Sequence, residues 1–505
     1  MSLDRRTVNA LLLGAPLAGA VPSAFAQANK KTLVLGMILE PTSLDPTIAS
    51  AAAIGEIVHY NIFEGLTKIA MDGAVTPLLA ERWYEAPDGK SYTFVLKKGV
   101  KFSDGAAFDA STVKFSFDRA KAEGSTNKAK KAVFDNISSV TAHDAHTVIL
   151  TLNNADATMP FRLGENTAVV LHPSSAATAA TKPVGTGPYK LDAWAKGSAI
   201  TLVKNEVFRD AAKVKLEKVT FRFINDPSAQ VAALLAGDID GMPRFGAFSA
   251  LQQFQGDKRF TVEVGSTAGK GILSLNNRKA PFNDVRVRRA LTHAIDRKAF
   301  IDGAQEGLGK PIGSHFAPTD LGYLDLTKTY PYDPEKAKAL LKEAGVTTPL
   351  NVTLTLPPPP YARKGGEIVA AMLAKVGVNA KIENVEWAQW LAGPFKGNFD
   401  MTIINHVEPL DYATAYADPK YYFGYDSAKF RGFVATLAAT SEIKEKARLW
   451  RDIQRQLAED AVNVFIWNPA QVAVFKKGVR GLWNSSPIFA NDLAAVSWAP
   501  PPVKI

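Results

Sequence analysis

Stretches with an apolar residue at every second position alternate along this chain with stretches that have one at every third or fourth position. Residues 92–96 follow the first pattern, and residues 148–152, 219–224 and 352–356 are further strand candidates. A period of two predicts a strand with one buried face, whereas a period near 3.6 predicts an amphipathic helix. Because both kinds of segment recur throughout, the sequence predicts an α/β protein.

Capping residues mark where several of the helices begin and end. Asp333 and Pro334 supply an N-cap and a first helical residue, and Gly345 follows the last turn. Asp226 and Gly237 bracket a second helix in the same way. The apolar spacing predicts further helices within residues 284–303 and from about residue 441 to 457.

Length and composition indicate a multidomain globular protein. A chain of 505 residues is too long for one hydrophobic core, so we expect two or three domains. Hydrophobic residues make up 47% and charged residues 21%, which excludes wholesale disorder. Beyond the N-terminal region we find no apolar run of about twenty residues, so we expect no membrane span. No short repeat is present, which excludes solenoids and propellers.

The first 26 residues have the pattern of an export signal. Arg5 and Arg6 form a basic start, residues 10–21 are mostly apolar, and residues 24–26 (Ala-Phe-Ala) fit a cleavage site. The paired arginines permit the twin-arginine route, and the general secretory route stays equally open. The chain has no cysteine, which excludes disulfides, thiolate metal centres and a lipidated cysteine. We therefore predict a periplasmic protein.

The positive charge of the chain does not by itself indicate a nucleic-acid partner. The formal charge is +10, but lysines and arginines are spread along the sequence. The densest clusters, at residues 128–131 and 286–289, lack interleaved aromatic residues. We interpret them as solvated faces, with a mild preference for anionic solutes or lipid head groups as the alternative.

Common enzyme motifs are missing. The sequence has neither G-x-S-x-G nor H-E-x-x-H, and the phosphate-loop pattern before Lys310 fails because Ala304 and Pro311 replace a glycine and a hydroxyl residue. Only seven histidines occur, and none pairs with a carboxylate at ligand-like spacing, so nickel or haem is a minor alternative. We therefore expect a binding protein without cofactor or metal, with an exported hydrolase as a weaker alternative.

Residues 79–120 form the most distinctive stretch. A strand at 92–96 is followed by a turn closed by Gly99, a Ser-Asp-Gly turn, and a helix capped near Asp109 or Ser111. This stretch resembles the signature of the family 5 extracellular solute-binding proteins, the peptide, nickel and oligosaccharide receptors of ABC importers. Similar segments at residues 33–46, 183–189, 219–240 and 277–300 extend the resemblance over most of residues 33–475.

This resemblance implies a monomeric, two-lobed periplasmic-binding-protein fold with a ligand cleft between the lobes. It implies a first lobe over residues 27–275 with an inserted subdomain at about 55–183, a second lobe over 276–474, and a return to the first lobe over 475–505. Residues 271–277 could cross between the lobes or form an ordinary surface strand. Closure would remove a solute from water, and contacts from both lobes would be needed to favour it. The solute would pass to an ABC permease.

The resemblance also implies ligand contacts in two segments. Tyr361 and Arg363 are the candidate contacts of the first segment, at the start of a helix. Arg363 resembles the arginine that grips the peptide carboxylate in dipeptide-binding relatives. Asp411, or failing that Glu408, would meet the ligand's ammonium group in the loop after the strand at 401–404. Each residue could instead have a structural role, on a solvated helix turn or as a turn cap.

The predicted loop departs from the usual pattern of peptide receptors at one point. They carry a Gly-Trp pair where this chain has Asn405 and His406. His406 could donate a hydrogen bond to an anionic solute or pack internally, and Trp387 and Trp390 could stack on a ring or belong to the core. We therefore predict a receptor for a di- or oligopeptide or a related amine-carboxylate solute such as an opine. An oligosaccharide or other nonpeptide solute is the alternative, and a chaperone or sensory receptor is a weaker one.

Overall fold

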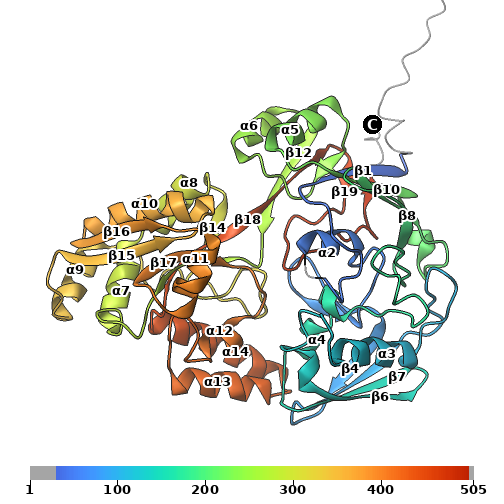
Figure 1. Cartoon of the computed structure of the whole chain (residues 1–505), viewed down its shortest axis with the longest axis horizontal. Coiled ribbons are helices and arrows are strands. Elements are labelled where there is room, and N and C mark those ends of the chain that lie inside the picture. The colour runs from blue at the N-terminus through green and yellow to red at the C-terminus, as the bar shows by residue number, and fades with distance from the viewer. Residues whose placement is uncertain (1–29, 50, 500–505) are drawn as a thin grey trace, which may run out of the picture.

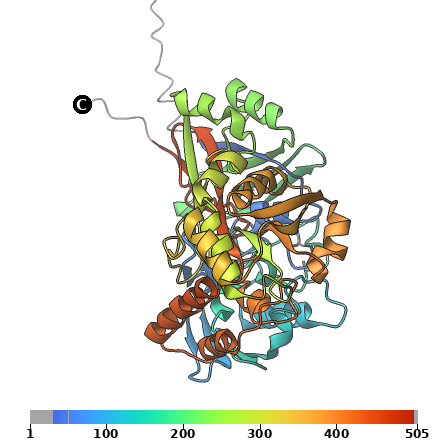
Figure 2. The same ribbon diagram turned by 90° about the vertical axis from the view of Figure 1, so that its left-hand side faces the viewer.

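The computed structural model describes residues 30–49 and 51–499. The predicted export signal at residues 1–26 lies outside the described residues. Two lobes stand side by side, joined by strands that run from one into the other (Figure 1). Seen from the side of the second lobe, α5 (Pro227–Ala236) and α6 (Leu251–Gly256) lie at the top and the long helix α14 (Ile443–Glu459) at the bottom (Figure 2). Of the helices in the described part of the chain, none has both the length and the apolar character needed to cross a membrane.

The first lobe holds one half of a large mixed sheet, in the order β18-β11-β1-β10-β9-β8, where β18 (Val464–Lys476) is shared with the second lobe. Its β1 runs parallel to β10, and β10, β9 and β8 are antiparallel neighbours. As predicted, Asp226 caps α5 and Gly237 ends it in a left-handed conformation. The elements of this lobe are β1 (Thr32–Met37), α2 (Ala52–Val58), β8 (Tyr189–Ala195), β9 (Ala199–Lys204), β10 (Lys218–Phe223), α5 (Pro227–Ala236), β11 (Gly241–Met242), α6 (Leu251–Gly256), β12 (Phe260–Ser266), β19 (Val479–Arg480) and β20 (Ser497–Trp498).

A subdomain is inserted in the first lobe after α2. Its four-stranded antiparallel sheet has the order β4-β5-β7-β6, and α3 packs against it. The alternation at residues 92–96 is confirmed, since Tyr92, Phe94 and Leu96 are buried. Asp109 caps the following helix, as predicted. The elements are β2 (Thr67–Ile69), β3 (Val75–Pro77), β4 (Ala80–Glu85), β5 (Ser91–Leu96), α3 (Ala110–Lys121), β6 (Ile137–Asp144), β7 (Thr147–Leu152) and α4 (Met159–Arg162).

The second lobe holds the other half of the sheet, in the order β16-β15-β17-β13-β18. The helical region predicted within residues 284–303 is two helices, because Ile295 is extended and Asp296 caps a new helix by accepting from the Ala299 N–H group. The elements are β13 (Lys270–Leu275), α7 (Val285–Ala294), α8 (Arg297–Ala304), β14 (Gly309–Pro311), α9 (Pro334–Glu343), β15 (Leu350–Leu356), α10 (Pro360–Ala374), β16 (Val378–Asn384), α11 (Trp387–Ala392), β17 (Met401–His406), α12 (Tyr412–Tyr416), α13 (Ala428–Ala438), α14 (Ile443–Glu459) and β18 (Val464–Lys476).

Two short segments carry the chain between the lobes. Along β18, residues 464–467 pair with β13 of the second lobe and residues 470–476 pair with β12 of the first. The other crossing lies between the end of β12 at Ser266 and the start of β13 at Lys270. We therefore take residues 270–469 as lobe 2 and the remaining described residues as lobe 1. The domain boundaries at 275 and 474 stay predictions.

Hydrophobic packing fills each body and also connects the two lobes. Separate clusters lie under the sheet of lobe 1, inside the subdomain and under the sheet of lobe 2. A further cluster joins Tyr60 and Phe161 of lobe 1 with Phe316 and Tyr412 of lobe 2. The apolar contact between the lobes therefore lies next to the crossing strands.

Gly271 in β13 allows close packing at the centre of lobe 2. A Cβ at this position would lie 2.2 Å from a carbon of the Trp467 indole ring, which is fully buried. We expect Gly271→Ala to lower the free energy of unfolding by roughly 1–3 kcal/mol, because the added methyl group would overlap the indole ring and force closely packed side chains to move. Gly432→Ala is the matched control: its Cβ would meet nothing within 4 Å inside α13, so the variant should gain about 0.5–1 kcal/mol. Urea unfolding measures both, and equal effects would contradict this packing.

Candidate functional site

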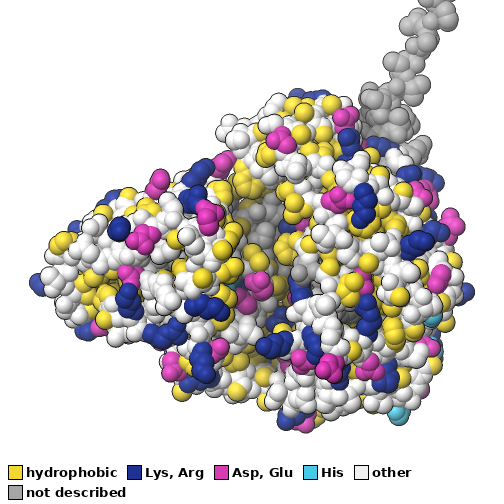
Figure 3. All heavy atoms as spheres, in the orientation of Figure 1, with side chains coloured by type: hydrophobic (Ala, Val, Ile, Leu, Met, Phe, Trp, Pro, Cys, Tyr) yellow, Lys and Arg dark blue, Asp and Glu magenta, His cyan; other side chains and the backbone are white. Residues whose placement is uncertain are grey.

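A cavity of about 480 Å³ lies where the two lobes face each other. The surface is hollowed along the line between the lobes (Figure 3). Lobe 1, lobe 2 and the crossing segments all contribute to the lining, which includes His59, Lys128, Arg162, Glu165, Asn166, Thr167, Arg244, Thr267, Gly269, Asn405, Val407, Glu408, Pro409, Pro469, Ser486 and Phe489. A volume of this size is typical of pockets for small molecules.

Charged side chains of both signs line the cavity. Arg162 pairs with Glu165 at 3.5 Å, and Arg244 pairs with Glu56, behind the lining, at 2.6 Å. Among the described residues, neither Lys128 nor Glu408 forms an ion pair within 4 Å, although the Glu408 carboxylate lies near enough to Lys270 to help raise the pKa of that lysine. The cavity therefore offers one free positive and one free negative group.

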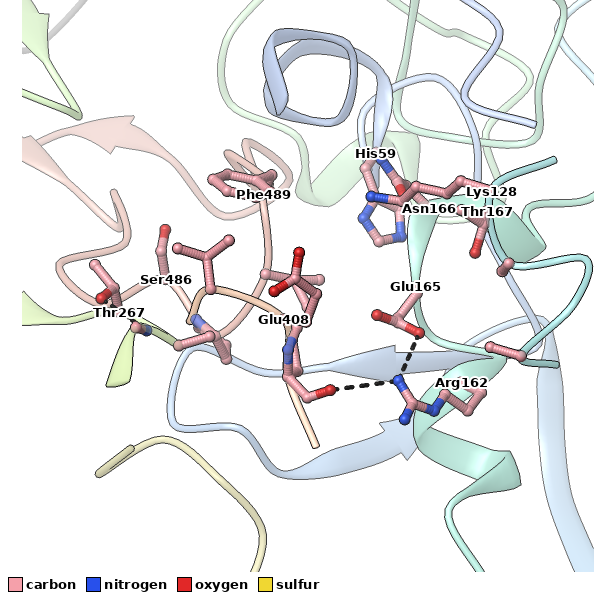
Figure 4. A pocket seen from close by; sticks show the side chains of 18 of the residues that line it. His59, Lys128, Arg162, Glu165, Asn166, Thr167, Thr267, Glu408, Ser486 and Phe489 are labelled. Atoms are coloured by element: carbon pink, nitrogen blue, oxygen red, sulfur yellow. Dashed lines mark hydrogen bonds and ion pairs between the residues drawn. The ribbon is translucent and has the colours of Figure 1, made fainter. Parts of the chain in front are cut away.

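The two free groups come from opposite walls. In Figure 4, Glu408 projects into the cavity from the side of lobe 2, and Lys128 lies on the facing wall with His59. Arg162, at the end of α4 in lobe 1, reaches across to the loop: its guanidinium donates to the backbone carbonyls of Pro409 and Leu410, each at 3.4 Å. The subdomain thus touches the loop that carries Glu408.

Behind this loop lies a buried charged network centred on Asp411. Lys270, whose side chain is fully buried, donates to the Asp411 carboxylate at 2.9 Å and to the Glu408 backbone carbonyl at 2.6 Å. Nε2 of His315 and Nδ1 of His406 lie 3.0 Å from the same carboxylate. Burial alone would raise the pKa of Asp411, but His315 and Lys270 hold that pKa well below its ordinary value.

The network leaves its members little freedom to bind anything else. Burial lowers the pKa of His315 to about 4, so its ring is neutral, donates through Nε2 and accepts from the Tyr416 hydroxyl at 2.9 Å. His406 reaches the Tyr422 hydroxyl at 3.0 Å with its other nitrogen. The two imidazoles and Asp411 bring metal-ligand atoms within 4.8 Å of one another. The fixed charge of Lys270 opposes a cation there, so the cluster acts as an internal support for the loop.

A family model decides what kind of protein this is. The model described as bacterial extracellular solute-binding proteins, family 5 Middle, matches residues 74–429. The chain belongs to the family 5 bacterial extracellular solute-binding proteins. This confirms the resemblance found in residues 79–120 and in the later segments.

Individual relatives extend over most of the chain. Di/tripeptide-binding protein 1 of Pseudomonas aeruginosa (strain UCBPP-PA14) is 32% identical over 434 residues, which cover 79% of this chain and 79% of that protein. The dipeptide-binding protein of Escherichia coli (strain K12) is 28% identical and covers 95% of this chain and 97% of its own length. The structure of the ABC transporter-associated periplasmic binding protein DppA from Helicobacter pylori, in complex with peptide STSA, has a TM-score of 0.72 at 28% identity over 94% of this chain and 99% of that one. The two-lobed α/β fold is confirmed.

One of the residues that the sequence predicts as ligand contacts, Glu408, lines the cavity of this family 5 protein. Asp411 and His406 lie in the buried network behind the loop. Arg363 pairs with Glu386 at 3.2 Å, with 43% of its side chain exposed, and does not line the cavity.

The predicted aromatic contacts lie around β17 rather than in the cavity lining. The Tyr361 hydroxyl accepts from the Asn405 backbone N–H at 3.3 Å. Trp390 is buried and donates to Thr402 Oγ1 at 3.0 Å, while Trp387 is exposed and meets Trp390 edge-on. Tyr361 thus holds the start of the loop, and Trp390 packs beneath it.

Several lining residues could not be recognised from the sequence. Lys128 was interpreted as part of a solvated basic cluster, but it faces the cavity. His59, Arg162 and Arg244 belong to no local motif and come together only through the fold. Lys270 did carry a signal, because a lysine within an apolar strand needs a buried partner.

The Lys270–Asp411 pair should be strongly coupled. We expect Lys270→Met alone to lower the free energy of unfolding by roughly 3–5 kcal/mol, because it leaves the Asp411 carboxylate buried without an ammonium partner. The double variant Lys270→Met/Asp411→Asn should recover a large part of that loss. A double-mutant cycle in urea measures the coupling, and additive effects would show that the pair does not support the loop.

Proposed function

We propose that the protein is a periplasmic receptor that captures a di- or oligopeptide, or a related solute with an amine and a carboxylate, and delivers it to an ABC permease. The observation that carries this proposal is the pair of unpaired charges in the cavity, Glu408 on lobe 2 and Lys128 on lobe 1. The names of the P. aeruginosa, E. coli and H. pylori relatives support the same class of solute.

The cavity suits a solute with a charge at each end. A zwitterion that leaves water loses the hydration of both charged groups, so each needs an opposite charge in the site. Glu408 can meet the amine and Lys128 the carboxylate, and both attractions strengthen as water is excluded. Because the two contacts come from different lobes, such a solute favours a closed arrangement over an open one.

The remaining residues from the sequence stay predictions. Arg363 could meet a carboxylate only if it left Glu386, and Asp411 could meet an amine only if it left Lys270. The engagement of Asp411 also favours a second candidate: an oligosaccharide or other nonpeptide solute, which would not need an additional carboxylate in this loop.

The charges at the two ends of the site can be tested separately. Isothermal calorimetry against di- and tripeptides, opines and sugars should show peptide binding by the wild-type protein. Glu408→Gln and Lys128→Met should each weaken that binding about tenfold or more, because each removes the only unpaired charge of its sign in the described lining. Lys131→Met is the matched control from the same basic cluster, outside the lining, and should bind like the wild type.

Two results would contradict the proposal in different ways. Binding of sugars but not of peptides would replace the proposed solute class with the second candidate. Peptide binding unchanged in both Glu408→Gln and Lys128→Met would show that these charges are not the solute contacts.

A further inference from the structure

We propose that His59 is a solute contact, and that its imidazole forms a hydrogen bond with an uncharged polar group of the solute, such as the amide of a short peptide. This proposal rests on the proposed function of the cavity as the solute site. It adds a specificity-determining residue to lobe 1 that no sequence motif indicates.

The main observation is that His59 is buried without a hydrogen-bond partner. It follows the last residue of α2, and its side chain is fully buried. Neither Nδ1 nor Nε2 makes a hydrogen bond of good geometry with a described residue, although the Gly164 carbonyl lies near enough to act on the ring. The ring lines the cavity and points into it from the wall of lobe 1 (Figure 4). Buried polar groups are almost always paired, so the ring has hydrogen-bonding capacity that a solute can use.

The charge state of His59 indicates what kind of group it would recognise. Burial, with the charge of Lys68, lowers the pKa of His59 to about 3, and the Gly164 carbonyl acts in the opposite direction. At neutral pH the ring is therefore uncharged, with one donor and one acceptor nitrogen. An amide or a hydroxyl complements such a ring, whereas charged ends of a solute find stronger partners at Glu408 and Lys128.

The surrounding structure holds the ring in place. His59 stacks on Tyr60 with ring centroids 3.8 Å apart. The Tyr60 hydroxyl donates to the Gly164 carbonyl and accepts from the Ile69 N–H group, both at 2.9 Å. Tyr60 has a φ of +65°, a conformation that non-glycine residues rarely adopt. Such strain is often kept where it positions a functional group, and here it fixes the residue next to His59.

A similar group lies on the opposite wall. Asn405 of lobe 2 lines the cavity, and its Oδ1 atom is buried without a hydrogen-bond partner among the described residues. On the same wall, Leu410 follows the lining residue Pro409 and has a φ of +54°. A solute that satisfies both His59 and Asn405 therefore bridges the lobes through uncharged hydrogen bonds as well as through charges.

The test replaces the polar ring with an apolar one of similar size. His59→Phe keeps the stacking on Tyr60 but removes both nitrogens. Without solute, its melting temperature should equal or exceed that of the wild type, because an unsatisfied buried group is gone. Its affinity for Ala-Ala and Ala-Ala-Ala, measured by calorimetry, should fall about tenfold. His59→Gln, which keeps an uncharged donor and acceptor, should retain more of the affinity than His59→Phe.

Ser314→Ala is the control for the loss of an unpaired polar atom. Its Oγ atom is also buried without a partner but lies outside the cavity lining, so peptide affinity should not change.

A lower melting temperature of solute-free His59→Phe would show that the ring has a structural role and would overturn the inference. Unchanged peptide affinity in His59→Phe would also overturn it while leaving the proposed function intact. If the wild-type protein bound none of the peptides and opines tested, the proposed function itself would fall, and the inference with it.

Discussion

Behind the loop that lines the cavity, Lys270 holds the carboxylate of Asp411, and this ion pair limits which charges the cavity can offer. A buried carboxylate without a partner would be strongly unfavourable, so Asp411 is stable only while an ammonium group lies beside it. The chain supplies that ammonium itself. The same lysine also binds the Glu408 backbone carbonyl, which fixes the loop from which the Glu408 side chain enters the cavity. The free negative charge of the site therefore belongs to Glu408.

The need to pair buried charges and polar groups also distinguishes the cavity walls from the network behind them. Around Asp411, donors and acceptors are matched within the protein. In the cavity, Lys128 and Glu408 lack ion-pair partners among the described residues, and the ring of His59 lacks hydrogen bonds. These groups lie on different lobes, and the lobes are joined by the crossing strands and an apolar cluster. A solute that pairs with them gains contacts from both lobes, which is the condition for binding to favour closure.

Local sequence patterns predicted the elements well because their causes are local. Alternation in residues 92–96 and the caps at Asp109 and Asp333 depend on neighbours in the chain, and each is confirmed. The division of the predicted helical region at Asp296 also had a local cause, the capping carboxylate, which spacing alone did not reveal. The family and the two-lobed fold were predicted from a resemblance that spans most of the chain, and both are confirmed.

The site was harder to predict because its residues meet only in three dimensions. Glu408 was predicted as an alternative to Asp411. Nothing near either residue indicated that Lys270, far earlier in the chain, would form an ion pair with the Asp411 carboxylate. The sequence around His59 indicates only the end of a helix, and the sequence around Lys128 indicates only a solvated basic cluster. Their role depends on how the subdomain faces lobe 2, and that arrangement results from the whole fold.

The central claim is that a small solute is bound by groups of both lobes and thereby brings the lobes together. Small-angle X-ray scattering of the protein with and without a saturating dipeptide or tripeptide tests it most directly. The account predicts a smaller radius of gyration when the peptide is bound. Scattering profiles that stay identical, while calorimetry shows the peptide to be bound, would contradict it.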